Sequence, residues 1–295
     1  SDRITVLRDG HLVGVIEHDD IVPDKVVNMM IGKELSDATA SRNLSVSSAR
    51  TVLEVKNLSS LGKYENVSFE VKAGEVVVLT GLVGSGRTEV LRSIFSADRY
   101  DSGEILFEGK KLPKSTAKVI DRGFGLIPED RRTQGFVPLL SVEKNVASTN
   151  YDTLSKHGFV LRRRERELGQ RAVKIVDLRP ANPAVPVGNL SGGNQQKAVL
   201  AKWLTRDLKV ILVDEPTVGI DIGAKDEIYN FIEGLAKEGV AVLLVSSDIA
   251  EVLRVAHRII VMKEGRIIHE FHEGVATQAD ILLAASGIRA ERKEA

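Results

Sequence analysis

The chain has 295 residues, of which 43% are hydrophobic, so it can bury one large core, or one complete domain and a fragment of another. Its 41 basic and 41 acidic residues balance to a net charge of +0, which excludes a general field for attracting nucleic acid or anionic lipid. No apolar run reaches the roughly 18 residues that a membrane-spanning helix needs.

The first stretch of the chain repeats its last one. The segment DRITVLRDGHLVG begins at Asp2 and the segment HRIIVMKEGRIIH begins at His257, and they align without gaps at a constant offset of 255 residues. The same offset relates VVNMMIG, residues 26–32, to ILLAASG, residues 281–287. Two unrelated hairpins with an acidic-Gly turn could share such a pattern by chance. A repeated C-terminal element is the better interpretation, because the following helical segment keeps the same spacing.

The repeat divides the chain into three parts. We expect residues 1–35 to be the C-terminal tail of an upstream domain, residues 36–50 a Ser-rich linker, and residues 51–295 a complete domain. Short apolar runs open this domain as strands, with antiparallel pairing expected around residues 64–76. From about residue 128 to about residue 200 (128–200) the pattern becomes mainly helical, which predicts a helical subdomain inserted into an α/β core.

A glycine-rich stretch, GLVGSGRTEV (Gly81–Val90), follows an expected strand and opens an expected helix. Its glycines allow backbone N–H groups to converge on phosphate oxygens, and Thr88 can offer its hydroxyl to Mg²⁺. A dinucleotide fingerprint fits poorly, because Glu89 stands where that pattern needs a third glycine or an alanine. Taken alone, the stretch also allows a glycine turn that binds no ligand.

A second motif, LSGGNQQK, places Ser191, Gly192 and Gly193 at the start of another expected helix. The serine hydroxyl, the bare backbone N–H groups and the positive end of the helix dipole together form an anion-binding surface. A plain helix cap needs only the serine, and each glycine in the first turns costs about 1 kcal/mol of helix stability. The two glycines therefore favour a binding role.

Two adjacent carboxylates end the buried strand VILVDEP, residues 210–216. Asp214 is placed to hold the shell of a magnesium ion, and Glu215 to orient or deprotonate a water that attacks a γ-phosphate. An acid pair that caps a helix is the alternative, which the glycine-rich loop earlier in the chain disfavours. The run VAVLLVSS, residues 240–247, predicts a further parallel strand.

In this order and spacing, GLVGSGRTE, LSGGNQQK, VILVDEPTVGID and VSSDIAEV resemble the ATP-binding domain of an ABC transporter over nearly all of residues 51–288. The likeness is strongest to the second of two fused domains in bacterial ribose- and galactose-type monosaccharide importers. It implies an α/β P-loop NTPase fold of the ABC ATPase type, with a mixed sheet, an antiparallel β region and an inserted helical subdomain. It also implies a transport-coupled ATPase that uses ATP and Mg²⁺ and lies peripherally on the cytoplasmic side of the cell membrane.

The resemblance assigns a role to each motif. Glu215 is the implied catalytic residue, and the implied magnesium ligands are Thr88 and, through water, Asp214, with Glu129 as a further candidate. The signature Ser191–Gly193 would contact ATP that is held mainly by the other domain, so two composite sites result. The implied ATP-binding residues are Gly81, Val83, Gly84, Ser85, Gly86, Arg87, Thr88, Glu89, Glu129, Asp214, Ser247, Ser191, Gly192 and Gly193.

The implied partners are the upstream domain of the same full-length chain, transmembrane permease subunits and, indirectly, an extracytoplasmic sugar-binding protein, but no nucleic acid. One alternative is a soluble twin ATPase that acts on nucleic acid or ribosomes, which the balanced charge and the short linker disfavour. Another is a regulatory nucleotide sensor that never turns over, which the retained Glu215 and the intact signature disfavour.

Three positions depart from the general pattern of the family: Arg87 replaces lysine, Glu129 replaces glutamine and Ser247 replaces histidine. Arg87 exchanges a compact ammonium for a planar fork, and Glu129 brings a carboxylate toward the phosphates. Ser247 lacks the reach and the protonation chemistry of an imidazole. We therefore expect this domain to bind Mg-ATP, to hydrolyse it poorly at its own loop and to be weakly active in isolation. Its signature would complete an efficient site on the upstream domain.

Overall fold

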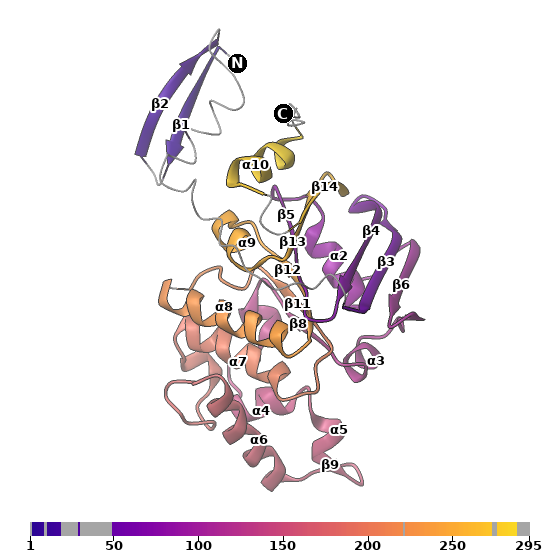
Figure 1. The fold of residues 1–295 in the computed structure, drawn as a ribbon. Helices are drawn as coiled ribbons and strands as arrows, with labels where there is room; N and C mark the ends of the chain where they lie inside the picture. The colour runs from indigo at the N-terminus through magenta and orange to yellow at the C-terminus, as the bar shows by residue number, and fades with distance from the viewer. Residues whose placement is uncertain are drawn as a thin grey trace.

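The computed structural model describes residues 2–8, 11–18, 29, 49–220, 222–272 and 276–287 (Figure 1). The core is a six-stranded sheet with the strand order β14-β13-β5-β12-β11-β8. Neighbouring strands are parallel except β13 and β14, which form an antiparallel hairpin at one edge. These strands are β5 (Val76–Gly81), β8 (Phe124–Ile127), β11 (Val210–Asp214), β12 (Ala241–Val245), β13 (Arg258–Lys263) and β14 (Arg266–His272).

The central strands are unbroken apolar runs because they are buried in the core. Every residue of β11 and β12 is buried, as expected for parallel strands that are covered on both faces. The helix α2 (Arg87–Ile94) packs against β5, β11 and β12. Helices α8 (Ile222–Lys237), α9 (Ile249–Val255) and α10 (Gln278–Ser286) pack against β12, β5 and β13 respectively. Because β5, β11 and β12 run parallel, the loops that follow them lie at the same, carboxyl-terminal end of the sheet. Ligands bind at this end in open α/β sheets.

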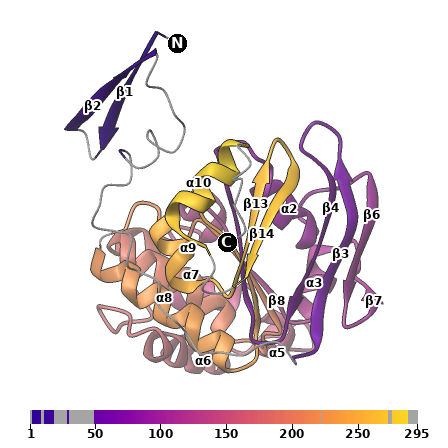
Figure 2. The same ribbon diagram turned by 45° about the horizontal axis from the view of Figure 1, so that its top comes forward.

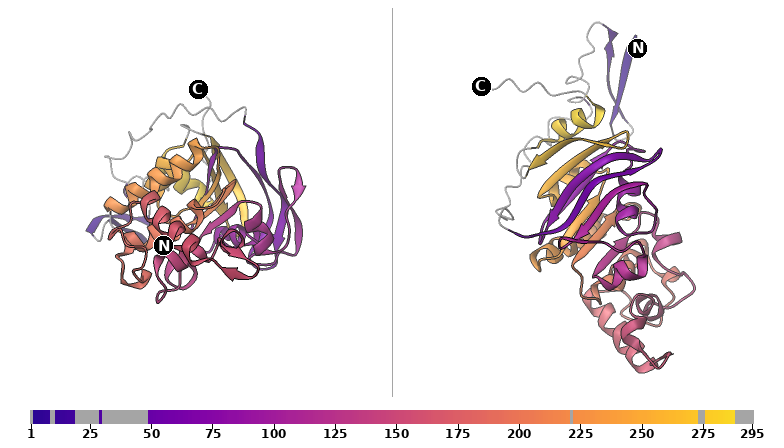
Figure 3. Two further views of the ribbon diagram at one scale, coloured as in Figure 1. Left: turned by 90° about the horizontal axis from the view of Figure 1, so that it is seen from below. Right: turned by 90° about the vertical axis from the view of Figure 1, so that its right-hand side faces the viewer.

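The predicted antiparallel region is confirmed as a separate sheet with the order β4-β3-β6-β7. Figures 2 and 3 show it beside the core sheet, and β4 contacts both β14 and β12. Its first two strands alternate between buried and exposed side chains over much of their length, because one face packs on the core. The strands are β3 (Thr51–Ser60), β4 (Tyr64–Lys72), β6 (Ser102–Phe107) and β7 (Lys110–Lys111).

The segment between β8 and β11 forms a mainly helical lobe at the lower end of Figure 1. Helix α4 packs against α6 and α7, and the short helix α3 (Thr116–Asp121) precedes β8. No helix of the described residues has the length and apolar character to cross a membrane. The lobe consists of η3 (Arg131–Gly135), α4 (Val142–Ala147), α5 (Tyr151–Leu154), the strands β9 (Ser155–Lys156) and β10 (Phe159–Val160), α6 (Arg162–Ile175), η4 (Val187–Asn189) and α7 (Gly192–Leu204).

The N-terminal residues form a hairpin of β1 (Arg3–Arg8) and β2 (His11–Glu17). Its pairing reproduces that of β13 with β14 at the offset of 255 residues, since Arg3 pairs with Glu17 as Arg258 pairs with His272. Both hairpins also contain a register shift at the matching position, between Val6 and Leu7 in one and between Val261 and Met262 in the other. The expected helix over residues 26–32 and the linker over residues 36–50 lie almost wholly outside the described residues.

Candidate nucleotide site

The phosphate loop joins β5 to α2 and is closely packed at two glycines. Gly81 has a φ of 149°, and a Cβ there would collide with the carbonyl oxygen of Met262 on β13. Gly86 caps α2 with a φ of 91°, and its Cβ would lie 2.7 Å from the carbonyl oxygen of Lys63. The Ser85 hydroxyl is buried and has no hydrogen-bond partner among the described residues. A buried, unpaired hydroxyl at the start of a helix suits a phosphate oxygen.

The tip of this loop faces solvent. Val83 is 94% exposed, and no atom lies within 4 Å of the place where Gly84 would carry a Cβ. Glu89 lies in the first turn of α2 and is partly buried. The tip of the loop is thus open on its outer side.

Thr88, Glu129 and Asp214 meet at one small cavity of about 60 Å³ below the loop. Thr88 Oγ1 donates a hydrogen bond to Asp214 Oδ1 over 3.1 Å. Burial raises the pKa of Asp214 to about 7; the Thr88 hydrogen bond opposes this shift, and the charges of Glu129 and Glu215 add to it. The cavity is lined by Thr88, Arg92, Leu126, Pro128, Glu129, Asp130, Gln134 and Asp214.

These oxygen donors fit a magnesium ion that is shared with a nucleotide. Mg²⁺ takes one or two protein oxygens and completes its shell with water and phosphate oxygens. Within the described part of the chain no group of three or more His, Cys, Asp or Glu side chains could hold a metal ion. The hydroxyl of Thr88 and the carboxylate of Asp214 are the two oxygen ligands that this site offers to such an ion.

Arg87 points at the acid pair and at the end of β12. Its side chain is only 8% exposed, and its Nη1 donates to the carbonyl oxygen of Ser246 over 3.0 Å. The same nitrogen lies 3.8 Å from Glu215 Oε1, and Nη2 lies 3.5 Å from the carbonyl oxygen of Leu82. Burial lowers the pKa of Arg87, and the charges of Glu215 and Asp214 oppose that shift. The guanidinium thus joins the phosphate loop, the candidate catalytic carboxylate and the segment before Ser247.

Glu215 adopts a backbone conformation that side chains rarely tolerate. Its φ is 43°, in the left-handed region, which costs roughly 1–2 kcal/mol for a residue other than glycine. Its backbone N–H donates to the carbonyl oxygen of Val245 over 2.9 Å, which holds the turn against β12. A strained backbone conformation persists where many surrounding contacts hold the residue in place, and functional sites are the usual location of such residues.

Ser247, which stands in the histidine position of the family, is exposed, whereas Ser246 beside it is fully buried. Ser246 Oγ donates a short hydrogen bond to the buried Glu251, and Asp248 caps α9 and pairs with Lys225 over 3.0 Å. Contacts of Ser246 and Asp248 thus hold this segment in place.

Glu251 belongs to this site although the sequence analysis did not single it out. It is 1% exposed, and burial raises its pKa to about 7. An acid three residues after the cap Asp248 has the pattern of a capping box, so the sequence alone suggests only a helix start. In the structure its side chain bonds Ser246 instead.

Glu251→Gln should reduce the loss of stability that the protein undergoes as the pH rises. The native pKa of about 7 exceeds the reference value of 4.5, so the native state binds a proton that the unfolded state has lost between these pH values. Stability from this group therefore falls as pH rises through that window. The Tm of the variant minus that of the wild type should increase by a few degrees from pH 5 to pH 8, since 1 kcal/mol shifts Tm by about 2–4 °C. The exposed Glu238→Gln is the control, and an equal change in both variants would contradict the expectation.

The signature forms a capped turn at the start of α7. Ser191 Oγ accepts hydrogen bonds from the backbone N–H and from Nδ2 of Asn194, over 3.5 and 2.9 Å. A Cβ on Gly192 would lie 3.1 Å from Nη2 of Arg131, and Gly193 is buried. No hydrogen bond or ion pair between described residues joins this turn to the phosphate loop of the same chain.

The fold and the site define a class of protein. A glycine-rich loop between a parallel strand and a helix, with an acid pair at the end of nearby β11, is typical of a P-loop nucleotide-binding protein. Residues 64–218 match the family model described as ABC transporter, so the chain belongs to this family. The resemblance and the fold class inferred from the motifs are confirmed.

Curated relatives match over nearly the whole chain. The chain is 43% identical over 289 residues to the ribose import ATP-binding protein RbsA of Rhodococcus jostii, and 42% identical to that of Bacillus subtilis. A putative ribose/galactose/methyl galactoside import ATP-binding protein of Rhizobium etli is 40% identical. These matches cover 97–98% of this chain but only 57%, 58% and 55% of the three relatives. The chain therefore spans little more than half the length of these proteins.

Solved structures of single cassettes share the fold. The dimeric structure of MJ0796, a bacterial ABC transporter cassette, has a TM-score of 0.65 and 25% identity, and covers 75% of this chain and 98% of its own. A post-hydrolysis structure of the same cassette, bound to ADP and Pi, gives the same TM-score, identity and coverage.

Proposed function

We propose that the chain is the second of two ATP-binding domains in an ATPase that energises monosaccharide import, peripheral to the cytoplasmic side of a bacterial membrane. The observation that carries the proposal is the group of Thr88, Glu129 and Asp214 at the phosphate loop, together with the exposed Ser191 of the LSGG motif. The names of the relatives support a sugar as the transported substrate, since all three are import ATP-binding proteins for ribose or related sugars.

Each motif then has a step to perform. Residues 81–88 cradle the phosphates of ATP, and Thr88 with Asp214 holds Mg²⁺, which neutralises phosphate charge when it is bound. Glu215 orients the water that attacks the γ-phosphate. The signature Ser191–Gly193 contacts ATP that is held mainly by the upstream domain, where its N–H groups meet the phosphates.

The domain's own site is the weaker one in this proposal. The guanidinium of Arg87 lies 3.8 Å from Glu215, so the positive charge that should meet the γ-phosphate is engaged with the group that should activate water. The exposed Ser247 offers a hydroxyl without acid–base function at neutral pH. Binding of Mg-ATP is therefore retained while hydrolysis is slowed.

The hairpin of β1 and β2 supports an upstream domain of the same fold. In this domain, β13 pairs with β14 on one side and in parallel with β5 on the other. The matching strand β1 pairs with β2 alone among the described strands. We infer that its second edge receives the strand before the phosphate loop of the upstream domain.

Two matched substitutions test this inference. Val6 and Val261 occupy equivalent positions and are 3% and 0% exposed. In the full-length protein, Val261→Ala should destabilise this domain and Val6→Ala the upstream one, each by about 2 kcal/mol for the lost methyl groups and the cavity left behind. Differential scanning calorimetry would assign each change to a transition. A Val6→Ala variant with both transitions unchanged would refute the upstream pairing.

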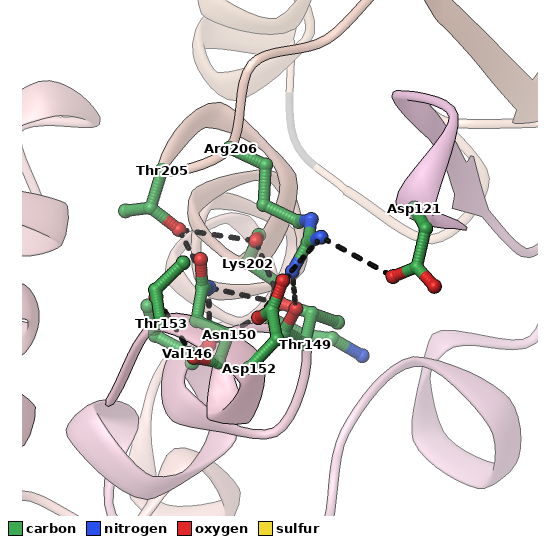
Figure 4. Close-up of polar contacts among 9 residues, drawn as sticks. All are labelled: Asp121, Val146, Thr149, Asn150, Asp152, Thr153, Lys202, Thr205 and Arg206. Atoms are coloured by element: carbon green, nitrogen blue, oxygen red, sulfur yellow. Dashed lines mark hydrogen bonds and ion pairs between the residues drawn. The ribbon is translucent and has the colours of Figure 1, made fainter. Parts of the chain in front are cut away.

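We propose that a permease segment docks at the boundary between the helical lobe and the core. A cavity of about 670 Å³ opens there, lined by residues that include Asp121, Asn150 and Arg206. Arg206, at the end of α7, makes two hydrogen bonds of 3.0 and 3.1 Å to Asp152 and lies 3.9 Å from Asp121 (Figure 4). The arginine links both walls of the cavity, so a segment docked there contacts the signature helix and the core together.

Reconstitution of the full-length protein with its permease tests the proposed function. Vesicles should accumulate a monosaccharide only with Mg-ATP, and ATP turnover should rise when the permease is present. ATP turnover that responds to RNA or DNA instead of the permease would favour the twin-ATPase alternative, and an absence of turnover would favour the regulatory sensor. The balanced charge of the chain disfavours the first alternative.

A further inference from the structure

Arg131 is a buried arginine that pairs with carbonyl groups instead of a carboxylate. It lies in the π-helical turn η3, two residues after Glu129, and is 9% exposed. Its Nη1 donates to the carbonyl oxygen of Val218 over 2.7 Å and its Nη2 to that of Gly219 over 3.0 Å. Its Nε is buried without a hydrogen-bond partner, and no ion pair between described residues includes it. Because burial of an unpaired charge is costly, such a contact needs a functional reason.

The two carbonyls belong to the loop of residues 216–220, which directly follows Glu215. Gly219 has a φ of 68°, and Val218 is 52% exposed, so the loop turns outward beyond the acid pair. Apart from the hydrogen bond between Val218 N–H and the carbonyl oxygen of Glu215, over 3.3 Å, no backbone–backbone hydrogen bond is made by the described N–H groups of this loop. Thr217 is buried and anchors the inner end of the loop, whereas the guanidinium holds the carbonyl groups of the exposed outer part, at Val218 and Gly219.

The signature lies close to the same guanidinium, with room for only a glycine beside it. A Cβ on Gly192 would lie 3.1 Å from Arg131 Nη2 and 3.3 Å from the carbonyl oxygen of Gly219. On the other side, a Cβ on Gly135 would lie 3.2 Å from Arg131 Cβ and 2.9 Å from Val199 of α7. Glycines at these two places thus allow η3, the loop and the start of α7 to approach one side chain.

We propose that Arg131 is a positioning residue that holds the loop of residues 216–220 against the signature, so that the acid pair and Ser191–Gly193 keep one relative arrangement. The inference rests on the proposed function, in which the acid pair serves this domain's nucleotide and the signature serves the partner's. The planar fork presents two separate N–H groups to two successive carbonyls in a fixed geometry, which the single flexible ammonium of a lysine does not reproduce. Arg131 therefore links the two composite sites within one chain.

The test compares Arg131→Met, Arg131→Lys and the control Arg132→Met, which alters the exposed neighbour, in the full-length protein. Hydrogen exchange of the amides of residues 217–220 should become about tenfold faster in Arg131→Met and stay unchanged in the control. ATP turnover with the permease should fall about tenfold in kcat, with KM for ATP within about twofold, because positioning rather than binding is lost. Arg131→Lys should lie between, since it keeps the charge and one hydrogen bond; it also serves if the methionine variant does not fold.

Exchange and kcat that match the control would overturn the inference. Faster exchange with an unchanged kcat would also overturn it, because the contact would then be structural only. A wild-type protein without ATP turnover would refute the proposed function instead, and the exchange measurement would still show whether Arg131 holds the loop.

Discussion

Ser191→Arg in the full-length protein is expected to lower ATP turnover by about 100-fold or more, because it removes a hydrogen-bonding group at a phosphate and fills the space with a long side chain. Ser191 is exposed at the start of α7, where it faces the partner's nucleotide in the proposed arrangement. Glu215→Gln should lower turnover by less than about twofold, although loss of a general base at a dominant site costs about 100-fold or more.

Steady-state ATPase assays with the permease would measure both losses. Ser191→Thr is the matched control, since threonine also caps a helix and keeps the hydroxyl. Its turnover should stay near that of the wild type, because both the helix cap and the hydroxyl are kept. Similar losses from Ser191→Arg and Glu215→Gln would contradict the proposed inequality of the two sites.

Restoring the residues of the general family pattern should make ATP turnover depend more strongly on Glu215. The triple variant carries Arg87→Lys, Glu129→Gln and Ser247→His. In this variant a compact ammonium replaces the guanidinium that lies 3.8 Å from Glu215, and an imidazole replaces the hydroxyl of Ser247. Adding Glu215→Gln to this variant should cost about tenfold or more in turnover, because the domain's own site then contributes to hydrolysis.

The comparison needs four proteins: wild type, Glu215→Gln, the triple variant and the quadruple variant. The double-mutant logic isolates the coupling between Glu215 and the three restored positions. The triple variant should also turn over ATP faster than the wild type. If Glu215→Gln costs the same in both backgrounds, the three departures do not explain a weak site.

Much of the fold could be predicted because its signals are local. The glycine-rich loop, the LSGG turn and the acid pair each depend on neighbouring residues, so their order along the chain indicated the ABC fold before any contact was known. The repeat could also be detected from the sequence, because strands with the same pattern of side chains twist and bulge in the same way. The structure adds that the register shift between Val6 and Leu7 recurs between Val261 and Met262.

The partners of the buried charges could not be predicted in this way. The position of Arg87 in the glycine-rich loop predicts a contact with phosphate, whereas its shortest hydrogen bond is to the carbonyl oxygen of Ser246, 159 residues away. The motifs did not single out Arg131, yet it bonds the carbonyls of Val218 and Gly219, 87 and 88 residues away. Such contacts depend on how the helical lobe packs on the sheet and on which way each side chain leaves its backbone. Local periodicity carries no information about either, so only the packed chain reveals them.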